Sequence, residues 1–325
     1  MNGDGRVITA QARKINVVFK SSTSPESAAP IEELPKTEFA KQSEDFIEIC
    51  KELDDMIGLE KVKELVFQIY AMLQIKKHRE KEGLRIDSQV YHMLFKGNPG
   101  TGKTTVARIL GKLFRSMGLL TKGHLVEVER ADLVGEYIGH TAQRTREVIK
   151  KAMGGILFVD EAYSLVRGGE KDFGKECIDC LVKAMEDYKN DFILILAGYP
   201  RELDDLLQAN SGLPSRFSMH IDFPDYTIEQ LNKIAHKMAF EKEYVILPEA
   251  MIKIRELIAN EKHMNFNFSN ARFIRNLVEK AIRNQAVRLM KKTGKLTKES
   301  LLHLTFEDFI ETKTTPVIEE KFAGI

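Results

Sequence analysis

The stretch GNPGTGKTT, residues 97–105, follows the pattern G-x-x-x-x-G-K-[ST], with Gly97, Gly102, Lys103 and Thr104 at the fixed positions. The apolar run YHMLFKG leads into it, and the helical pattern KTTVARILGKLFRSMG overlaps its end. Glycines let backbone N–H groups wrap around phosphates, and the positive end of the following helix adds to the attraction. The stretch therefore predicts a phosphate-binding loop between a strand and a helix, rather than a chance glycine-rich turn.

The residue types in this loop predict that it binds ATP with Mg²⁺. Lys103 would reach the β- and γ-phosphates, and the Thr104 hydroxyl would be a ligand of Mg²⁺. The remaining loop positions complete the predicted nucleotide site: Asn98, Pro99, Gly100, Thr101 and Thr105.

A second motif, GILFVDEA at residues 155–162, places a carboxylate pair at the end of an apolar run. Asp160 is predicted to hold the metal and its water shell, and Glu161 to orient the attacking water as a general base. An acidic pair by itself often begins a helix. In combination with the phosphate loop, it favours ATP hydrolysis.

Short apolar runs alternate with longer amphipathic ones between about residues 46 and 225. This alternation predicts an α/β domain with a central parallel sheet flanked by helices. Three runs, ILFV, FILILA and to a lesser degree HMLF, are continuously apolar, as expected of central strands that are covered on both faces. The predicted strands are residues 91–97, 124–130, 155–161, 192–199 and 219–224.

After Asp225 the pattern changes to three successive helices, predicted at residues 227–244, 248–262 and 269–292. We therefore expect a small all-α lid domain over residues 226–325, after the α/β domain of residues 46–225. Residues 1–45 are rich in Ser, Pro, Ala and Glu, which favours a flexible tail. A short hairpin within residues 6–20 is the alternative for its first part.

Composition limits the classes of partner. With 49 Lys and Arg against 48 Asp and Glu, the net charge of +1 gives no global attraction to nucleic acid or an anionic membrane. The chain has no apolar run near the roughly 20 residues of a membrane helix, and its first residues lack the continuous apolar core that is typical of a signal peptide. Three cysteines fit a reducing compartment, so we expect the cytoplasm. Cys177 and Cys180 form a C-x-x-C inside a helical pattern, which favours core packing over a redox or zinc site.

Taken together, these motifs resemble the AAA+ ATPases, and within them the family of the CbbX and stage V sporulation protein K ATPases. The resemblance runs from about Leu53 to Met290. It rests on IGLEKVKE (57–64), MLFKGNPGTGKTTVARI (93–109), ADLVGEYIGHTAQ (131–143), GGILFVDEAYSL (154–165), FILILAGYP (192–200), GLPSRF (212–217) and SNARFIRN (269–276).

The resemblance implies roles for residues that composition and spacing leave unassigned. The segment Asp55 to Gly58, with Met56 and Ile57 between them, matches the family segment that lines the adenine site, although by itself it could be an ordinary helix start. Arg216 matches the arginine finger, which reaches the γ-phosphate bound by the neighbouring subunit; otherwise it is a surface arginine. Arg272 matches the second sensor arginine, which the lid places over the nucleotide.

The stretch EYIGH, residues 136–140, matches the aromatic pore loop that lines the channel of AAA+ rings. Tyr137 and Ile138 would grip a polypeptide through apolar contact, and Gly139 would let the loop move. The alternative is that Tyr137 packs on the core. A second, weaker candidate loop is RGGEKDFG, residues 167–174.

One position departs from the family pattern. Many AAA+ proteins end the fourth strand with Asn, Thr or Ser, whereas this strand ends in LAGYP. Which group near Tyr199 replaces that polar sensor stays open at this stage.

The resemblance implies an ATP-hydrolysing protein-remodelling motor that acts as a homo-oligomeric ring of six subunits on an unidentified protein client. It also implies a role in endospore formation. The alternatives are a Rubisco-activase-type chaperone and an ATP-gated switch or binding module with slow turnover. A nucleic-acid motor is disfavoured, because EYIGH offers no Lys or Arg to a phosphate backbone.

Overall fold

The computed structural model describes residues 46–86, 89–137, 139–168, 173–265, 267–292 and 296–310. The predicted tail and its alternative hairpin, residues 1–45, lie outside these ranges.

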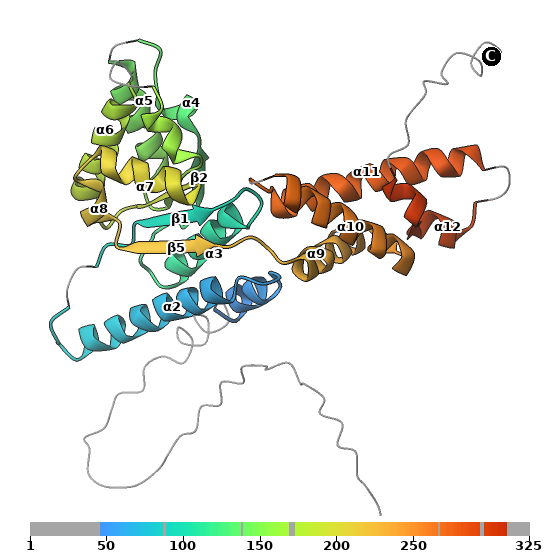
Figure 1. Cartoon of the computed structure of the whole chain (residues 1–325). Helices are drawn as coiled ribbons and strands as arrows, with labels where there is room; N and C mark the ends of the chain where they lie inside the picture. The colour runs from blue at the N-terminus through green and yellow to red at the C-terminus, as the bar shows by residue number, and fades with distance from the viewer. Residues whose placement is uncertain are drawn as a thin grey trace, which may run out of the picture. The chain divides into compact units, whose positions relative to one another are not determined.

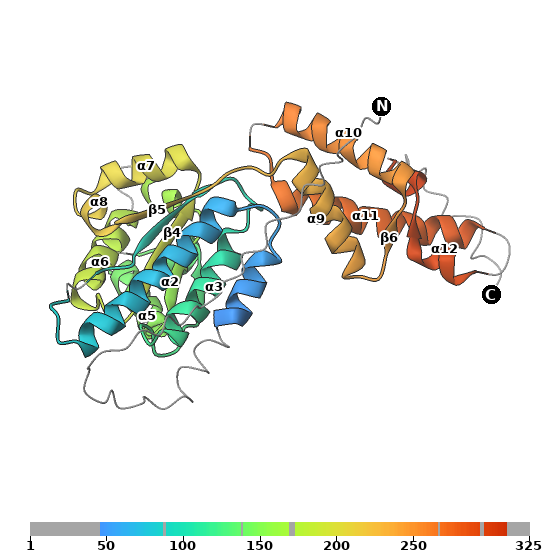
Figure 2. The same ribbon diagram turned by 90° about the horizontal axis from the view of Figure 1, so that it is seen from below.

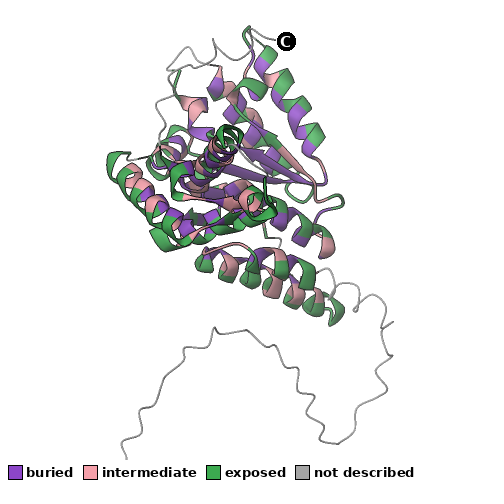
Figure 3. Cartoon of the chain, turned by 90° about the vertical axis from the view of Figure 1, so that its right-hand side faces the viewer, coloured by how far each residue is buried: buried purple, intermediate pink, exposed green. Residues whose placement is uncertain are grey.

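Five parallel strands form the central sheet (Figure 1). They are β1 (Met93–Gly97), β2 (Leu125–Val128), β3 (Ile156–Val159), β4 (Ile193–Gly198) and β5 (Met219–Phe223). Their order is β2-β3-β4-β1-β5, and every neighbouring pair is parallel. All residues of β3 and β4 are buried, as their apolar runs predict (Figure 3). The predicted parallel sheet is confirmed.

Each face of the sheet has its own hydrophobic core, because successive strand residues point to opposite faces. Phe95 and Phe158 share a cluster with helices α2 (Glu60–Lys81) and α3 (Lys103–Ser116), the helices in front of the strands in Figure 2. Leu94 and Leu157 belong to the other cluster. Its helices are α5 (His140–Ala152), α6 (Gly174–Asp187) and α7 (Pro200–Ala209).

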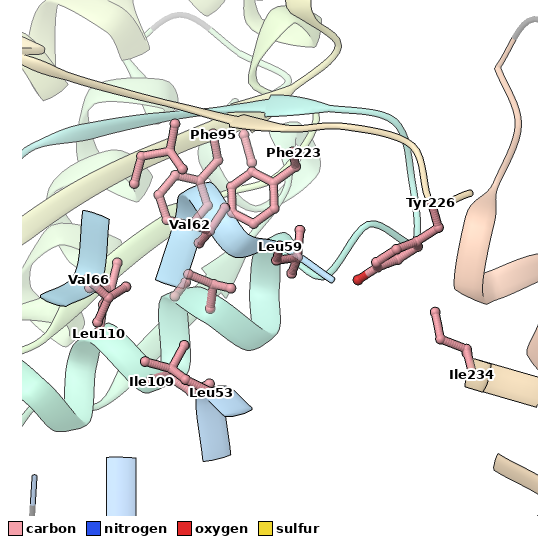
Figure 4. Packing of buried hydrophobic residues seen from close by; sticks show 14 of the residues in the cluster. Leu53, Leu59, Val62, Val66, Phe95, Ile109, Leu110, Phe223, Tyr226 and Ile234 are labelled. Atoms are coloured by element: carbon pink, nitrogen blue, oxygen red, sulfur yellow. The ribbon is translucent and has the colours of Figure 1, made fainter. Parts of the chain in front are cut away.

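Aromatic packing fixes the first core beneath the phosphate loop. The ring centroid of Phe95 lies 4.9 Å from that of Phe223 and 6.3 Å from that of Phe158. Figure 4 shows Phe95 and Phe223 beside Val62 of α2. Buried aromatic rings contribute large apolar areas, so this cluster holds the end of β1 firmly where the loop begins.

The lid domain is helical, as predicted, and begins with a capping box in which Thr227 and Gln230 bond each other's backbone N–H. Its helices are α9 (Ile228–Phe240), α10 (Pro248–Met264), α11 (Asn270–Lys291) and α12 (Lys298–Leu302). The structure adds a parallel pair, β6 (Val245–Ile246) with β7 (His303–Leu304), and a 3-10 turn η2 (Phe306–Phe309). Strands of two residues leave no periodic signal, so the sequence pattern missed them.

An ion pair with one buried partner ties the end of the lid together. The Arg288 guanidinium donates to both carboxylate oxygens of Asp308, at 2.8 and 2.9 Å, and the Asp308 side chain is 1% exposed. Two parallel bonds fix geometry as well as charge. Within the part of the chain that the structure describes, every helix is too short or too polar to cross a membrane.

Candidate active site

The phosphate loop connects the end of β1 to the start of α3. Gly100 (φ 71°) and Gly102 (φ 98°) adopt left-handed backbone conformations that favour glycine. The Thr101 hydroxyl donates to the carbonyl of Asn98 at 2.8 Å and closes the loop on itself. The motif therefore forms a compact turn at the N-terminus of a 14-residue helix.

Lys103 points into its own loop. Its ammonium group donates to the carbonyl oxygens of Gly97 at 2.9 Å and Asn98 at 2.8 Å. Burial lowers the pKa of Lys103, and the nearby Asp160 carboxylate opposes that shift. The loop carbonyls thus hold the ammonium where phosphate oxygens could replace them.

A cavity of about 340 Å³ opens over the loop, a volume within the range of small-molecule sites. It brings together the loop, the carboxylate pair and the start of the lid helix α11. Its lining residues are Gly97, Pro99, Gly100, Gly102, Lys103, Thr104, Thr105, Arg108, Glu127, Asp160, Glu161, Tyr163, Gly198, Tyr199, Ala271, Arg272 and Arg275.

The carboxylate pair lies where β3 turns into the 3-10 helix η1 (Ala162–Val166). Glu161 has φ 47°, a left-handed conformation that is uncommon for a residue with a side chain. Its backbone N–H donates to Asp160 Oδ1 at 3.0 Å. Such backbone strain concentrates at functional sites. Glu161 also lines a second cavity of about 330 Å³, with Glu129, Arg130 and Val134 before the EYIGH loop.

Tyr199, which follows β4, lines the main cavity. Burial raises its pKa, the Glu161 carboxylate adds to the shift, and the positive charge of Arg272 opposes it. Its ring lies 5.7 Å from that of Tyr163. A hydroxyl-bearing side chain thus occupies the end of the fourth strand, close to both an acid and an arginine.

The lid contacts the phosphate loop directly. Asn270 is fully buried, with φ 44°, and its amide donates to the Asp225 carboxylate at 2.8 Å. Asp225 also accepts a bond from the Asn98 side chain at 3.0 Å. The Tyr226 hydroxyl donates to the carbonyl of Thr101 at 3.2 Å. These bonds hold the start of α11 at the loop and bring Arg272 into the cavity.

The segment predicted for adenine lies beside the loop but outside the cavity. A side chain added at Gly58 would meet Gln230 and Tyr226. A side chain added at Gly102 of the phosphate loop would meet Met56, so this segment packs closely against the loop. Ile57 packs against the first core. The described residues that line the cavity do not include Ile57, Gly58, Asn98 or Thr101.

Arg216 lies in the short helix α8 (Leu213–Arg216), and it is not among the described residues that line the cavity. Its guanidinium pairs with Glu186 at 2.8 Å and donates to the Gly212 carbonyl at 2.9 Å. Within one chain, the structure therefore does not bring Arg216 to the phosphate loop.

The EYIGH loop presents Tyr137 to solvent, with 66% of the residue exposed and its ring against that of His140 at 5.4 Å. This exposure argues against the alternative that Tyr137 packs on the core. Gly139, with φ 83°, precedes α5, and a side chain there would meet nothing within 4 Å. Ile138 and residues 169–172 of the second candidate loop lie outside the described residues.

Cys177 and Cys180 lie on α6 as free thiols. Cys177 is fully buried, and burial raises its pKa to about 12, far from the reactive thiolate of a redox motif. The interpretation of Cys177 as a core residue is confirmed.

Four charged or aromatic residues of the cavity were not predicted from the sequence: Arg108, Glu127, Tyr163 and Arg275. Helical spacing could have indicated two of them, because Arg108 follows Thr104 by four residues and Arg275 follows Arg272 by three. For Glu127, the signal is one acid inside the otherwise apolar strand LVEV.

The sequence supports what the geometry indicates. Residues 93–225 match the ATPase family associated with various cellular activities (AAA), and residues 227–318 match the AAA lid domain. Stage V sporulation protein K of Bacillus subtilis is 58% identical over 245 residues, which cover 75% of this chain and 76% of that protein. The chain belongs to the AAA ATPases.

Other relatives of this AAA ATPase carry other names. Protein CbbX of Cereibacter sphaeroides is 44% identical over 80% of this chain and 85% of its own length. A chloroplastic ribulose bisphosphate carboxylase/oxygenase activase of Cyanidioschyzon merolae is 42% identical, over 86% of this chain and 95% of its own length. The predicted family and the predicted ATPase activity are thus confirmed, and nucleotide binding follows from them.

Solved structures confirm the fold of this AAA ATPase. The FIGL-1 AAA domain in complex with ADP has a TM-score of 0.56 and 19% identity, covering 78% of this chain and 80% of that one. The Thermotoga maritima RuvB Holliday junction branch migration motor has a TM-score of 0.50 and 21% identity, and the match covers 79% of this chain and 69% of that one. At such identities the likeness carries the fold alone.

Proposed function

We propose that this AAA ATPase hydrolyses Mg–ATP as a ring of subunits and uses the energy to remodel a protein client. One observation carries the proposal. A single cavity joins Lys103, the Asp160–Glu161 pair and Arg272, while Arg216 and Tyr137 lie outside it.

The donors present fit Mg²⁺. The Thr104 hydroxyl and the Asp160 carboxylate both line the cavity, and both are the oxygen ligands that this ion prefers. Sites for Mg²⁺ use one or two protein ligands together with substrate phosphates and waters, so two donors are sufficient. When bound, the ion would neutralise charge on the β- and γ-phosphate oxygens.

Within the cavity, we assign Glu161 as the base that takes a proton from the attacking water. Water adds to the γ-phosphorus, the bond to the ADP oxygen breaks, and the proton passes to the Glu161 carboxylate. Lys103 exchanges its bonds to loop carbonyls for bonds to phosphate oxygens, and Arg272 offsets the remaining negative charge. The Tyr199 hydroxyl takes the place of the polar group that ends the fourth strand in many relatives, and orients the water.

We assign Arg216 to the site of a neighbouring subunit. Its position outside the cavity of its own chain supports this role, since a guanidinium at the γ-phosphate can raise phosphoryl-transfer rates by about 10³ to 10⁵. A closed ring of six subunits, as the family resemblance implies, would let every Arg216 reach a neighbour's nucleotide.

The client would be a polypeptide gripped by Tyr137. An exposed aromatic between glycines offers apolar contact without sequence preference. The relative at 58% identity is named for sporulation, which favours a role in endospore formation. We place that role in the cytoplasm because a chain with only three cysteines fits a reducing compartment. The relatives named as Rubisco activases support a second candidate, a chaperone of Rubisco.

The mass of the Glu161→Gln protein, measured by light scattering with and without Mg–ATP, tests the ring. A shift toward six subunits with ATP supports the proposal. A mass that stays monomeric at all concentrations contradicts it and favours an ATP-gated switch. Stimulation of ATP hydrolysis by added Rubisco would favour the second candidate.

A further inference from the structure

Glu127 connects the edge strand β2 to the predicted metal ligand. Its carboxylate oxygen Oε1 accepts a hydrogen bond of 3.3 Å from the Thr104 hydroxyl, and Oε2 accepts one of 3.2 Å from Arg108. Each oxygen of the carboxylate therefore has its own partner. Glu127 also lines the cavity over the phosphate loop.

Two features of the fold bring these groups together. Thr104 and Arg108 are four residues apart on α3, so they lie on the same face of the helix. Glu127 is paired in register with Phe158 of β3, two residues before Asp160. The edge of the sheet thus presents Glu127 to the same space that Thr104 and Asp160 face.

The chemistry of a hydroxyl ligand gives this contact a meaning. A threonine hydroxyl has one proton and two lone pairs, and a metal ion can use only a lone pair. A carboxylate only accepts hydrogen bonds, so the Thr104 proton must point at Glu127. The lone pairs are then left for the cavity.

A role for Glu127 as a simple surface ion pair with Arg108 would explain fewer of these contacts. The side chains of Arg108 and Glu127 are 60% and 42% exposed, and exposed pairs contribute little to stability. An ion pair would also give no reason for the bond from Thr104.

We propose that Glu127 is a positioning residue for Mg²⁺, which orients the Thr104 hydroxyl toward the ion while Arg108 holds the second carboxylate oxygen. The inference rests on the proposed binding of Mg–ATP. Partners that orient metal ligands typically change metal affinity by about 10- to 100-fold when they are removed.

Metal affinity itself provides the test, with Mn²⁺ as the probe and a non-hydrolysable ATP analogue at saturation. The electron paramagnetic resonance signal of free Mn²⁺ gives the dissociation constant. Glu127→Ala should raise it about tenfold, while binding of the analogue in EDTA stays within twofold of wild type. Glu127→Gln should restore most of the affinity, because the amide oxygen still accepts the Thr104 proton. Glu147→Ala removes an exposed acid elsewhere, on α5, and should change nothing.

A double-mutant cycle adds a second readout. In a Thr104→Ala background, Glu127→Ala should have no further effect on Mn²⁺ affinity, since the group that it orients is gone. An unchanged dissociation constant in Glu127→Ala, or a Gln variant as weak as the Ala variant, would overturn the inference. A wild-type protein that binds no analogue would instead overturn the proposed function.

Discussion

The backbone N–H of Ala271, at the start of the lid helix α11, donates a 3.1 Å hydrogen bond to the carbonyl oxygen of Gly100 in the phosphate loop. A side chain at Gly100 would lie 2.3 Å from the carbonyl oxygen of Ser269 and 2.8 Å from the backbone nitrogen of Arg272. The absence of a side chain at this position is what lets the lid approach the phosphates closely.

Gly100→Ala should therefore separate the lid from the loop. We expect ATP affinity to fall at least about tenfold, since Arg272 would be displaced by an ångström or more. Nucleotide titration checks this. Gly83→Ala is the matched control, because Gly83 has a similar φ of 65° but open space around it. In both variants, a residue with a side chain in the left-handed conformation lowers the stability of the fold by about 1–2 kcal/mol. Equal ATP affinity in the two variants would contradict the role of the close approach.

Much of the site could be predicted because its chemistry depends on local sequence. The phosphate loop needs glycines and a lysine at fixed spacing, and the carboxylate pair follows an apolar strand, so both patterns are visible in the chain. The cavity confirms that these two motifs lie together. Arg272 was placed by resemblance alone, since its position depends on how the lid meets the loop.

What the sequence could not predict depends on packing between distant segments. Asn270 looks like an ordinary helix start, but it adopts φ 44° and bonds Asp225, 45 residues earlier. Glu127 looks like one polar residue in a strand, and only the pairing of β2 with β3 brings it to Thr104. Neither relationship has a periodic signature. The adenine contact that the resemblance implies for Ile57 stays a prediction; in the structure, Ile57 is partly buried against the first core.

Glu161→Gln should abolish hydrolysis while ATP binding is retained. The amide keeps the size of the side chain but cannot take a proton, and loss of a general base typically lowers the rate by about 10² to 10⁴. Phosphate release and nucleotide titration measure the two effects separately. Glu129→Gln, in the second cavity, is the control for a general loss of negative charge nearby. Normal turnover in Glu161→Gln would exclude Glu161 as the base.

Arg216→Ala should lower turnover by about 10³ or more without weakening ATP binding, if the guanidinium acts in a neighbouring subunit. Glu186→Ala is the control, because it removes the partner of Arg216 within the chain and leaves the arginine in place. It should keep most of the activity. A loss of activity in Glu186→Ala as large as in Arg216→Ala would mean that the salt bridge, not the free arginine, is required.

Mixed rings test the same assignment in another way. Arg216→Ala and Lys103→Ala subunits are each expected to be inactive alone. A mixture should recover some hydrolysis, because a site with an intact Lys103 can meet an intact Arg216 from the next subunit. Mass measurement must show that mixed rings form. Mixed rings that stay inactive would contradict sites shared between subunits.

Tyr137→Ala should remove the stimulation of ATP hydrolysis by an unfolded protein, for which casein serves as the probe. The ratio of stimulated to unstimulated rate should fall to about one, since the exposed ring supplies the apolar grip. Tyr137→Phe should preserve the ratio. Tyr188→Ala removes another exposed tyrosine, outside the loop, and should leave it unchanged. Full stimulation in Tyr137→Ala would exclude this residue as the client contact.

His92 should make the stability of the α/β domain depend on pH. The residue is fully buried immediately before β1, and its Nδ1 accepts a hydrogen bond of 2.9 Å from the backbone N–H of Leu194. Burial lowers its pKa from 6.5 to about 4. The folded state therefore keeps this imidazole neutral while the unfolded chain protonates it.

The contribution of the neutral His92 to the free energy of unfolding is present in full above about pH 6.5. It is lost as the pH falls toward 4, because the unfolded state binds the proton in that window and the folded state does not. The total is on the order of 3 kcal/mol. Urea unfolding of wild type and His92→Asn at several pH values checks this. The variant keeps an acceptor for the Leu194 N–H, is less stable at pH 7.5 because its side chain is smaller, and should lose less stability than wild type between pH 6.5 and 4.5. His78→Asn, at an exposed position of α2, should follow the wild-type slope. Parallel pH profiles for wild type and His92→Asn would show that His92 does not titrate on unfolding.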